Sequence, residues 1–223
     1  MAFPIQPLRL KICGQKTLAD AEASMAAGAD MIGVILFAGS KRFVPFAEAT
    51  AWIRQVPPAV ERVAVFVDPA IDEVRAALAD DLFHTAQLHG NETPGFLAAL
   101  NEAGFASRLI KALRVTDRAS VEVVDSFPTR RFLLDGPHPG SGQTFDWSLA
   151  ATAVERHPAA SFLLAGGLTA ETVGDALRVV RPHGVDVASG VEAAPGGKDP
   201  EKLRRFVQAA RTARRIVESE RES

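Results

Sequence analysis

Two glycine-containing turns near the end of the chain have the composition of a phosphate-binding site. Gly166-Gly167 follow the apolar run Leu163–Ala165, and Ser189-Gly190 follow a second apolar run that begins at Val185. Glycine lets backbone N–H groups approach an anion closely, and the N-terminus of a helix adds partial positive charge. We therefore predict that Gly166, Gly167, Ser189 and Gly190 bind phosphate. Ordinary tight turns are the alternative interpretation.

Cys13 and Asp135 are the candidates for acid–base chemistry, because each ends a short apolar segment. A free thiol has a pKa of about 8.5, so it needs a neighbouring cation, such as that of Lys11, to act as a base at neutral pH. A carboxyl group must be kept protonated to act as an acid, and a partly dry pocket does this. An inert buried thiol and an aspartate that caps a strand end are the alternatives.

Further polar residues are predicted to contact a substrate at the same place: Arg42, Gln87, His89 and Asp186. A guanidinium such as that of Arg42 holds a carboxylate through two hydrogen bonds, although an ordinary solvated loop arginine is the alternative. His89 either orients the substrate or has a structural role. No His, Cys and Asp residues have metal-ligand spacing and no P-loop is present, so these residues give no sign of a metal site or of a P-loop nucleotide site.

These candidates are placed by a repeated pattern of short apolar segments and longer amphipathic segments. The apolar segments are expected strands, at Leu8–Cys13, Met31–Phe37, Arg62–Val67, His84–Leu88, Arg108–Leu113, Arg131–Leu134, Ser161–Ala165 and Val185–Ala188. The amphipathic segments are expected helices, among them Leu18–Ala27, Ala70–Ala79, Thr93–Ala103 and Pro200–Val217. Thr93, Asp199 and Thr169 are expected to cap helix starts.

Strict alternation of strand and helix predicts a parallel sheet covered by helices. Eight such units in 223 residues favour an α/β fold of one closed (β/α)₈ TIM barrel, which covers residues 1–223 as a single domain and has a charged, fraying tail at about 212–223. An open doubly wound sheet is the alternative, but Cys13-Gly14-Gln15-Lys16 lacks its glycine-rich fingerprint. Alternation along the strands places Cys13 and Asp135 inside the barrel, at the end where TIM barrels carry function.

Composition excludes several other classes of function. The net charge of −2 does not favour nucleic acid, and the longest apolar run is far shorter than the ~20 residues that a membrane helix needs. The first residues lack a signal peptide, and a single cysteine fits a reducing cytosol. We therefore expect a cytoplasmic protein with a small-molecule partner and neither nucleic acid nor membrane, either a monomer or, as an alternative, a dimer.

Taken together, these motifs resemble those of the phosphoribosylanthranilate isomerase family over nearly the whole chain and in the same order. The resemblance rests on the following segments: Lys11–Gly14, Ala27–Asp30, Ser40–Val44, Val65–Val67, Gln87–Gly90, Leu133–Asp135, Gly140–Trp147, Ala165–Thr169, Arg181–Pro182, Gly184–Val187, Ser189–Glu192 and Lys198–Pro200. This combination is highly specific.

The resemblance implies a TIM-barrel enzyme of tryptophan biosynthesis that catalyses the Amadori rearrangement of N-(5′-phosphoribosyl)anthranilate without metal or cofactor. It implies that Asp135 is the general acid that opens the furanose ring and that Cys13 is the general base that removes the C2 proton. Arg42 would hold the anthranilate carboxylate, and the loops after the last two strands would hold the ribose phosphate.

The sequence departs from the family pattern at Gln15-Lys16 and at Lys41, where positive charge is added beside the expected site. Two other functions therefore stay open at this point. One is an isomerase of another phosphorylated aminosugar, for which a second phosphate loop is expected and none is seen. The other is a non-catalytic sugar-phosphate-binding paralogue, which is expected to lose the acid or the base.

Overall fold

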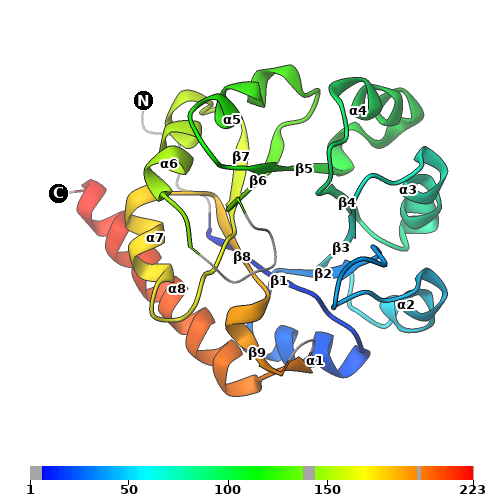
Figure 1. Cartoon of the computed structure of the whole chain (residues 1–223). Helices are drawn as coiled ribbons and strands as arrows, with labels where there is room; N and C mark the ends of the chain where they lie inside the picture. The colour runs from blue at the N-terminus through cyan, green and yellow to red at the C-terminus, as the bar shows by residue number, and fades with distance from the viewer. Residues whose placement is uncertain (1–6, 138–143, 195–196, 223) are drawn as a thin grey trace.

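Eight parallel strands close into a barrel in chain order, as Figure 1 shows in the centre of the molecule. The computed structural model describes residues 7–137, 144–194 and 197–222. The strands are β1 (Arg9–Cys13), β2 (Met31–Ile35), β3 (Glu61–Phe66), β4 (Thr85–Leu88), β5 (Leu109–Arg114), β6 (Arg131–Asp135), β7 (Ser161–Leu164) and β8 (Gly184–Val187). The predicted closed barrel and all eight predicted strands are confirmed, with ends that differ by one or two residues.

Helices form a ring around the barrel (Figure 1). They are α1 (Leu18–Ala27), α2 (Phe46–Ile53), α3 (Ile71–Leu78), α4 (Pro94–Leu100), α5 (Ala119–Glu122), α6 (Trp147–Arg156), α7 (Val173–Val180) and α8 (Pro200–Glu222). After β8 the chain forms the short 3₁₀ helix η5 (Ser189–Val191) and an antiparallel pair, β9 (Glu192–Ala194) with β10 (Gly197–Lys198). The last helix, α8, contacts both α7 and α1, so it completes the outer ring.

Two of the three predicted helix caps are confirmed. The Thr93 hydroxyl accepts a hydrogen bond from the N–H of Phe96 at 3.2 Å, and the Asp199 carboxylate accepts from the N–H groups of Glu201 and Lys202. The prediction that a helix starts at Thr169 is wrong. Thr169 accepts from the N–H of Glu171 within a turn, and α7 begins at Val173.

The expected helix Thr93–Ala103 is also shorter than predicted. Regular α-helix ends at Leu100, and residues Asn101–Phe105 form an irregular wider turn. Gly104 lies in this turn with φ of +93°, a left-handed conformation that an α-helix does not accommodate. The helical ladder is therefore broken before Ala103.

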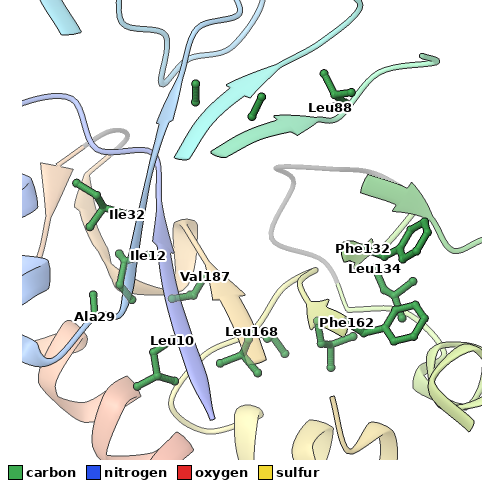
Figure 2. Packing of buried hydrophobic residues seen from close by; sticks show 14 of the residues in the cluster. Leu10, Ile12, Ala29, Ile32, Leu88, Phe132, Leu134, Phe162, Leu168 and Val187 are labelled. Carbon is green, nitrogen blue, oxygen red and sulfur yellow. The ribbon is translucent and has the colours of Figure 1, made fainter. Parts of the chain in front are cut away.

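Side chains alternate between two apolar clusters, one inside the barrel and one between the strands and the helices. Figure 2 shows part of the outer cluster, to which Leu10 and Ile12 of β1 contribute; within it the rings of Phe132 and Phe162 stack with centroids 5.7 Å apart. The inner cluster contains Cys13 and Leu133. Residues with the parity of Cys13 therefore point into the barrel, as the alternation predicts.

The N-terminal ends of the strands are tied together by the carboxylate of Glu61. It binds Arg9 of β1 at 2.9 Å and Arg131 of β6 at 2.5 Å, and it accepts a hydrogen bond from the hydroxyl of Thr85 on β4. This end of the barrel therefore has a structural network, and the opposite end is left for the candidate site. Among the described residues, no helix combines the length and apolar character needed to span a membrane.

Candidate active site

Cys13 is the C-terminal residue of β1, and its thiol faces into the barrel beside the ammonium group of Lys11. Gly33 of the neighbouring strand makes room for both groups. A Cβ atom at Gly33 would lie 2.8 Å from Cys13 Sγ and 3.1 Å from Lys11 Nζ. The register pairs Cys13 with Gly33, so parallel pairing of β1 and β2 brings the smallest residue beside the thiol.

Charges around Cys13 act on its pKa in opposite directions. Burial raises the pKa of the thiol, and the positive charges of Lys11 and Lys198 lower it in part, while the Asp186 carboxylate raises it. Lys11 Nζ donates to Asp186 Oδ1 at 2.9 Å inside the barrel. Burial lowers the pKa of Lys11, but the charges of Asp186 and Cys13 outweigh it, so the pKa is raised and Lys11 stays protonated.

The carboxyl group of Asp135 is held between a backbone N–H and a histidine ring. Asp135 Oδ1 accepts from the N–H of Gly136 at 2.8 Å, and Oδ2 lies 3.3 Å from His89 Nε2. Gln87 Nε2 lies 2.8 Å from His89 Nδ1. Because an amide nitrogen only donates, Nδ1 accepts and the ring proton is placed on Nε2. That nitrogen is buried and faces Asp135, but the contact does not have hydrogen-bond geometry.

The guanidinium of Arg42 is already bound by a carboxylate of the chain. Arg42 Nε donates to Glu192 Oε1 at 2.6 Å and Nη2 donates to Oε2 at 3.0 Å, with both side chains buried. Lys198 Nζ donates to Glu192 Oε1 at 3.2 Å and to the carbonyl oxygen of Cys13 at 2.6 Å. The arginine that we expected either to bind substrate or to be solvated is therefore anchored in a buried network.

The two glycine-containing loops lie against each other at the same end of the barrel. Gly166 and Gly167 have φ of +87° and +65°, and a Cβ at Gly190 would lie 2.1 Å from the carbonyl oxygen of Leu168. Hydrogen bonds within the described residues leave the N–H groups of Gly166, Gly167, Ser189 and Gly190 without a partner. Such partly exposed N–H groups are donors for an anion.

A buried ion pair fixes the loop that carries His89. Lys111 Nζ donates to Glu92 Oε2 at 2.7 Å and to the carbonyl oxygen of Gly90 at 2.9 Å. Glu92 in turn accepts from the N–H groups of Gly90 and Asp68. The loops after β3 and β4 are therefore held together next to His89 in the chain.

The predicted site residues fall into neighbouring groups at one end of the barrel. Cys13 and Asp186 lie around Lys11, with Arg42 against Gly14, where a Cβ would lie 2.6 Å from Arg42 Cδ. Gln87, His89 and Asp135 form the second group, and Gly166 adjoins it, since a Cβ there would lie 3.1 Å from Asp135 Oδ1.

Sequence reasoning gave no role to Glu192 and Lys198, although both occur in the segments that carry the resemblance. It also misjudged the departure at Gln15. That side chain is fully buried and donates to Ile12 O and Ser24 Oγ, both at 2.9 Å, so it packs against α1 and adds no charge to the site. Lys16 and Lys41 are exposed. The glycine-rich loop at Pro139–Gly142 lies outside the described residues.

In the described part of the chain, no group of three or more His, Cys, Asp or Glu residues is arranged to hold a metal ion. The groups able to do chemistry here include a thiol and a carboxyl group, with cations and backbone N–H donors around them. This arrangement suits proton transfer on an anionic substrate.

Comparison with known proteins gives a consistent match. Residues 10–209 match the family model described as N-(5′-phosphoribosyl)anthranilate (PRA) isomerase. The N-(5′-phosphoribosyl)anthranilate isomerase of Pelobacter propionicus is 41% identical over 211 residues, which cover 93% of this chain and 97% of that protein.

Solved structures agree with this match. The phosphoribosyl anthranilate isomerase of Thermotoga maritima has a TM-score of 0.83 and 35% identity, covering 92% of this chain and 100% of that chain. Monomers of the dimeric T. maritima enzyme have a TM-score of 0.81 and 34% identity, with the same coverage. A phosphoribosyl anthranilate isomerase in complex with reduced 1-(o-carboxyphenylamino)-1-deoxyribulose 5-phosphate scores 0.80 at 34% identity, again with 92% and 100% covered.

Proposed function

Because the chain belongs to the N-(5′-phosphoribosyl)anthranilate isomerase family and is an isomerase of tryptophan biosynthesis, we propose that Asp135 and Cys13 are its general acid and general base. One observation carries this proposal. Asp135 and Cys13 are the last residues of β6 and β1, and both face into the barrel. Strands β7 and β8 lie between β6 and β1, so the loops that follow them lie between the two groups. A sugar phosphate held by these loops has an acid on one side and a base on the other.

Asp135 gives a proton to the ring oxygen of the ribose as the C1–O bond breaks, which leaves a protonated Schiff base between C1 and the anthranilate nitrogen. Its position beside Gly166 supports this role, because the ring oxygen is joined to the carbon that carries the phosphate-bearing CH₂ group. His89 and Gln87 position the acid through the His89 Nε2 contact. A hydrogen-bonded acid of fixed orientation is what this step requires.

Cys13, as the thiolate, takes the proton from C2, and the electron pair of that C–H bond moves into the C1–C2 bond while the Schiff base nitrogen becomes an amine. The resulting enolamine tautomerises to the ketone. The positive charges of Lys11 and Lys198 favour the thiolate, because they lower the pKa of the thiol in part against the burial and the Asp186 carboxylate that raise it.

Two anchors hold the ends of the substrate. The free N–H groups of Gly166, Gly167, Ser189 and Gly190 bind the phosphate, and Arg42 binds the anthranilate carboxylate. Asp186, which accepts a hydrogen bond from the Lys11 ammonium, contacts the sugar from the barrel interior. The complex of a similar isomerase with a reduced carboxyphenylamino-deoxyribulose phosphate supports a substrate with a carboxylate at one end and a phosphate at the other.

The family match sets aside an isomerase of another aminosugar and a non-catalytic paralogue. We place the enzyme in the cytoplasm, where a biosynthetic enzyme with a catalytic thiol is kept reduced. We propose a monomer as its state, and a dimer is the alternative because the T. maritima relative is described as dimeric. Sedimentation of the purified chain distinguishes the two.

The proposed roles are tested with Cys13→Ser and Asp135→Asn. Removal of a general acid or base is expected to lower turnover by about 10²–10⁴-fold. Wild type is expected to restore growth of a tryptophan auxotroph that lacks this step, and neither variant is. Asp175→Asn is the matched control, because Asp175 is an exposed partner of Arg178 on α7. Activity near that of wild type in both variants contradicts the assignment.

A further inference from the structure

The carboxylate of Glu192 occupies only one of the two edges of the Arg42 guanidinium. A guanidinium offers a side edge, formed by Nε and one Nη, and an end edge, formed by both Nη atoms. Glu192 takes the side edge through Nε and Nη2. Among the described residues, Arg42 Nη1 has no hydrogen-bond partner, so the end edge remains available to a second carboxylate.

Lys198 compensates the charge of Glu192 and connects it to the catalytic strand. Its fully buried ammonium group donates to Glu192 Oε1, to the carbonyl oxygen of Cys13 and, at 3.4 Å, to that of Ala188. Burial lowers the pKa of Lys198, and the charges of Glu192 and Cys13 oppose that shift. Without this cation, the negative charge of Glu192 would repel an approaching carboxylate.

The stem of Arg42 is confined as well. The Cδ atom lies so close to Gly14 that a Cβ there would approach it to 2.6 Å, and Gly14 has φ of +78°. The side chain therefore passes directly over the backbone beside Cys13. An arginine that is free to rotate loses side-chain entropy when it is immobilised. Here the immobilisation is already present before any ligand arrives.

We infer that Glu192, neutralised by Lys198, is a positioning residue that fixes the end edge of Arg42 for the carboxylate of the substrate. It does not stand in for that carboxylate, because it binds the other edge. This inference rests on the proposed role of Arg42. It adds a determinant of specificity, since a rigid guanidinium favours substrates with a planar carboxylate at the correct distance from the reacting carbon.

The test compares two substrates in steady-state kinetics: the anthranilate substrate and the matching N-(5′-phosphoribosyl)aniline, which lacks the carboxylate. Glu192→Gln removes the charge and one acceptor with little change in shape. With the anthranilate substrate we expect KM to rise about tenfold, or ~1.4 kcal/mol, while kcat changes little. With the aniline substrate we expect the same KM for variant and wild type.

Two variants act as controls. Glu61→Gln removes another arginine-bound glutamate, at the opposite end of the barrel, and is expected to leave the preference for the carboxylate unchanged. Glu192→Asp keeps the charge but shortens the reach, and we expect an intermediate KM with the anthranilate substrate alone. Glu192→Asp also becomes the test variant if circular dichroism shows that Glu192→Gln does not fold.

The outcomes separate the inference from the proposed function. A KM that falls in Glu192→Gln shows that Glu192 competes with the substrate, and a KM that rises equally for both substrates shows a general structural role. Either result overturns the inference. If Arg42→Ala leaves the preference for the carboxylate intact, the proposed role of Arg42 itself is wrong.

Discussion

Burial and a neighbouring ammonium act on the Cys13 thiol in opposite directions, and the pH dependence of the reaction reports their balance. Burial raises the pKa of the thiol, and Lys11 is the strongest opposing charge. A base whose pKa is raised becomes active only as the pH increases. We therefore expect kcat/KM to increase with pH through the neutral range.

Lys11→Met tests this balance. Loss of the ammonium removes the main stabilisation of the thiolate, so the pKa of Cys13 is expected to rise further. Activity at neutral pH should fall at least tenfold and recover in part at higher pH. The rate of Cys13 alkylation, measured against pH, follows the same titration without substrate. A pH profile that does not move contradicts the role of Lys11. Because Asp186 loses its partner in this variant, thermal unfolding is measured alongside.

At the level of single residues, the sequence predicted the side-chain directions that follow from alternation along a strand. Cys13 and Lys11 have the same parity on β1, so their common inward face follows from the sequence. Glu192 and Lys198 lack such a signal. They meet Arg42 and Cys13 only because β9 and β10 pair after the barrel is complete, and no local pattern encodes contacts 150 or 185 residues apart.

The loops after β7 and β8 act as one element because their backbones touch. Gly190 lies so near the carbonyl oxygen of Leu168 that any side chain would separate the two loops. We expect Gly190→Ala to move the donors of one loop away from those of the other, because backbone atoms cannot give way as a flexible side chain does. Affinity for inorganic phosphate, measured by calorimetry, should fall about tenfold, and KM should rise.

Gly197→Ala is the matched control for this variant. Gly197 lies in the same segment after β8, but a Cβ there meets nothing within 4 Å. Its phosphate affinity should equal that of wild type. Equal affinity in Gly190→Ala as well would show that the close packing of the two loops does not hold the anion.

Elements whose ends are marked by local chemistry were predicted well, and the others were not. Helix α1, with a threonine cap and Gly28 in a left-handed conformation at its end, has the predicted bounds Leu18–Ala27. The start of α7 was placed too early, because the Thr169 hydroxyl accepts from the N–H of Glu171 within a turn that precedes the helix. The helix itself begins after Thr172, whose side chain makes no capping hydrogen bond to it, so no local capping residue marks its start.

For the whole molecule, the network of Glu61 at the N-terminal end predicts a pH dependence of stability. Burial alone would raise the pKa of Glu61, but the charge of Arg131 and the hydrogen bonds from Thr85 and Arg131 outweigh it, and the pKa is lowered. A carboxylate with a lowered pKa in the folded state stabilises the fold above its ordinary pKa of 4.5. That contribution is lost as the pH falls through the lowered value.

Glu61→Gln is therefore expected to lower the free energy of unfolding by about 2 kcal/mol at pH 7, because hydrogen bonds to a charged group are lost. The exposed Arg9 pair contributes little of this. Denaturant unfolding at a series of pH values should show the difference between wild type and variant shrinking below about pH 4.5. A difference that stays constant down to the lowest pH contradicts a role for the charge.

The barrel itself is the part of the molecule that the sequence predicted most completely, because eight repeats of one pattern reinforce each other. An error of one or two residues at any strand end does not change the order or direction of the strands. The network of Glu61 could not be predicted in this way. It joins β1, β3, β4 and β6 across the barrel, and no single sequence segment contains a pattern that predicts it.

The bond from Lys198 to the Cys13 carbonyl joins the first strand to the segment that follows the last one, 185 residues later. While the chain is being synthesised, Cys13 leaves the ribosome long before Lys198 does. Until then it is an ordinary thiol in water, open to alkylation. It becomes buried only when the final quarter of the chain has closed the barrel. As the chain has a single cysteine, a short pulse of a thiol reagent during translation would mark unfinished molecules faster than completed ones.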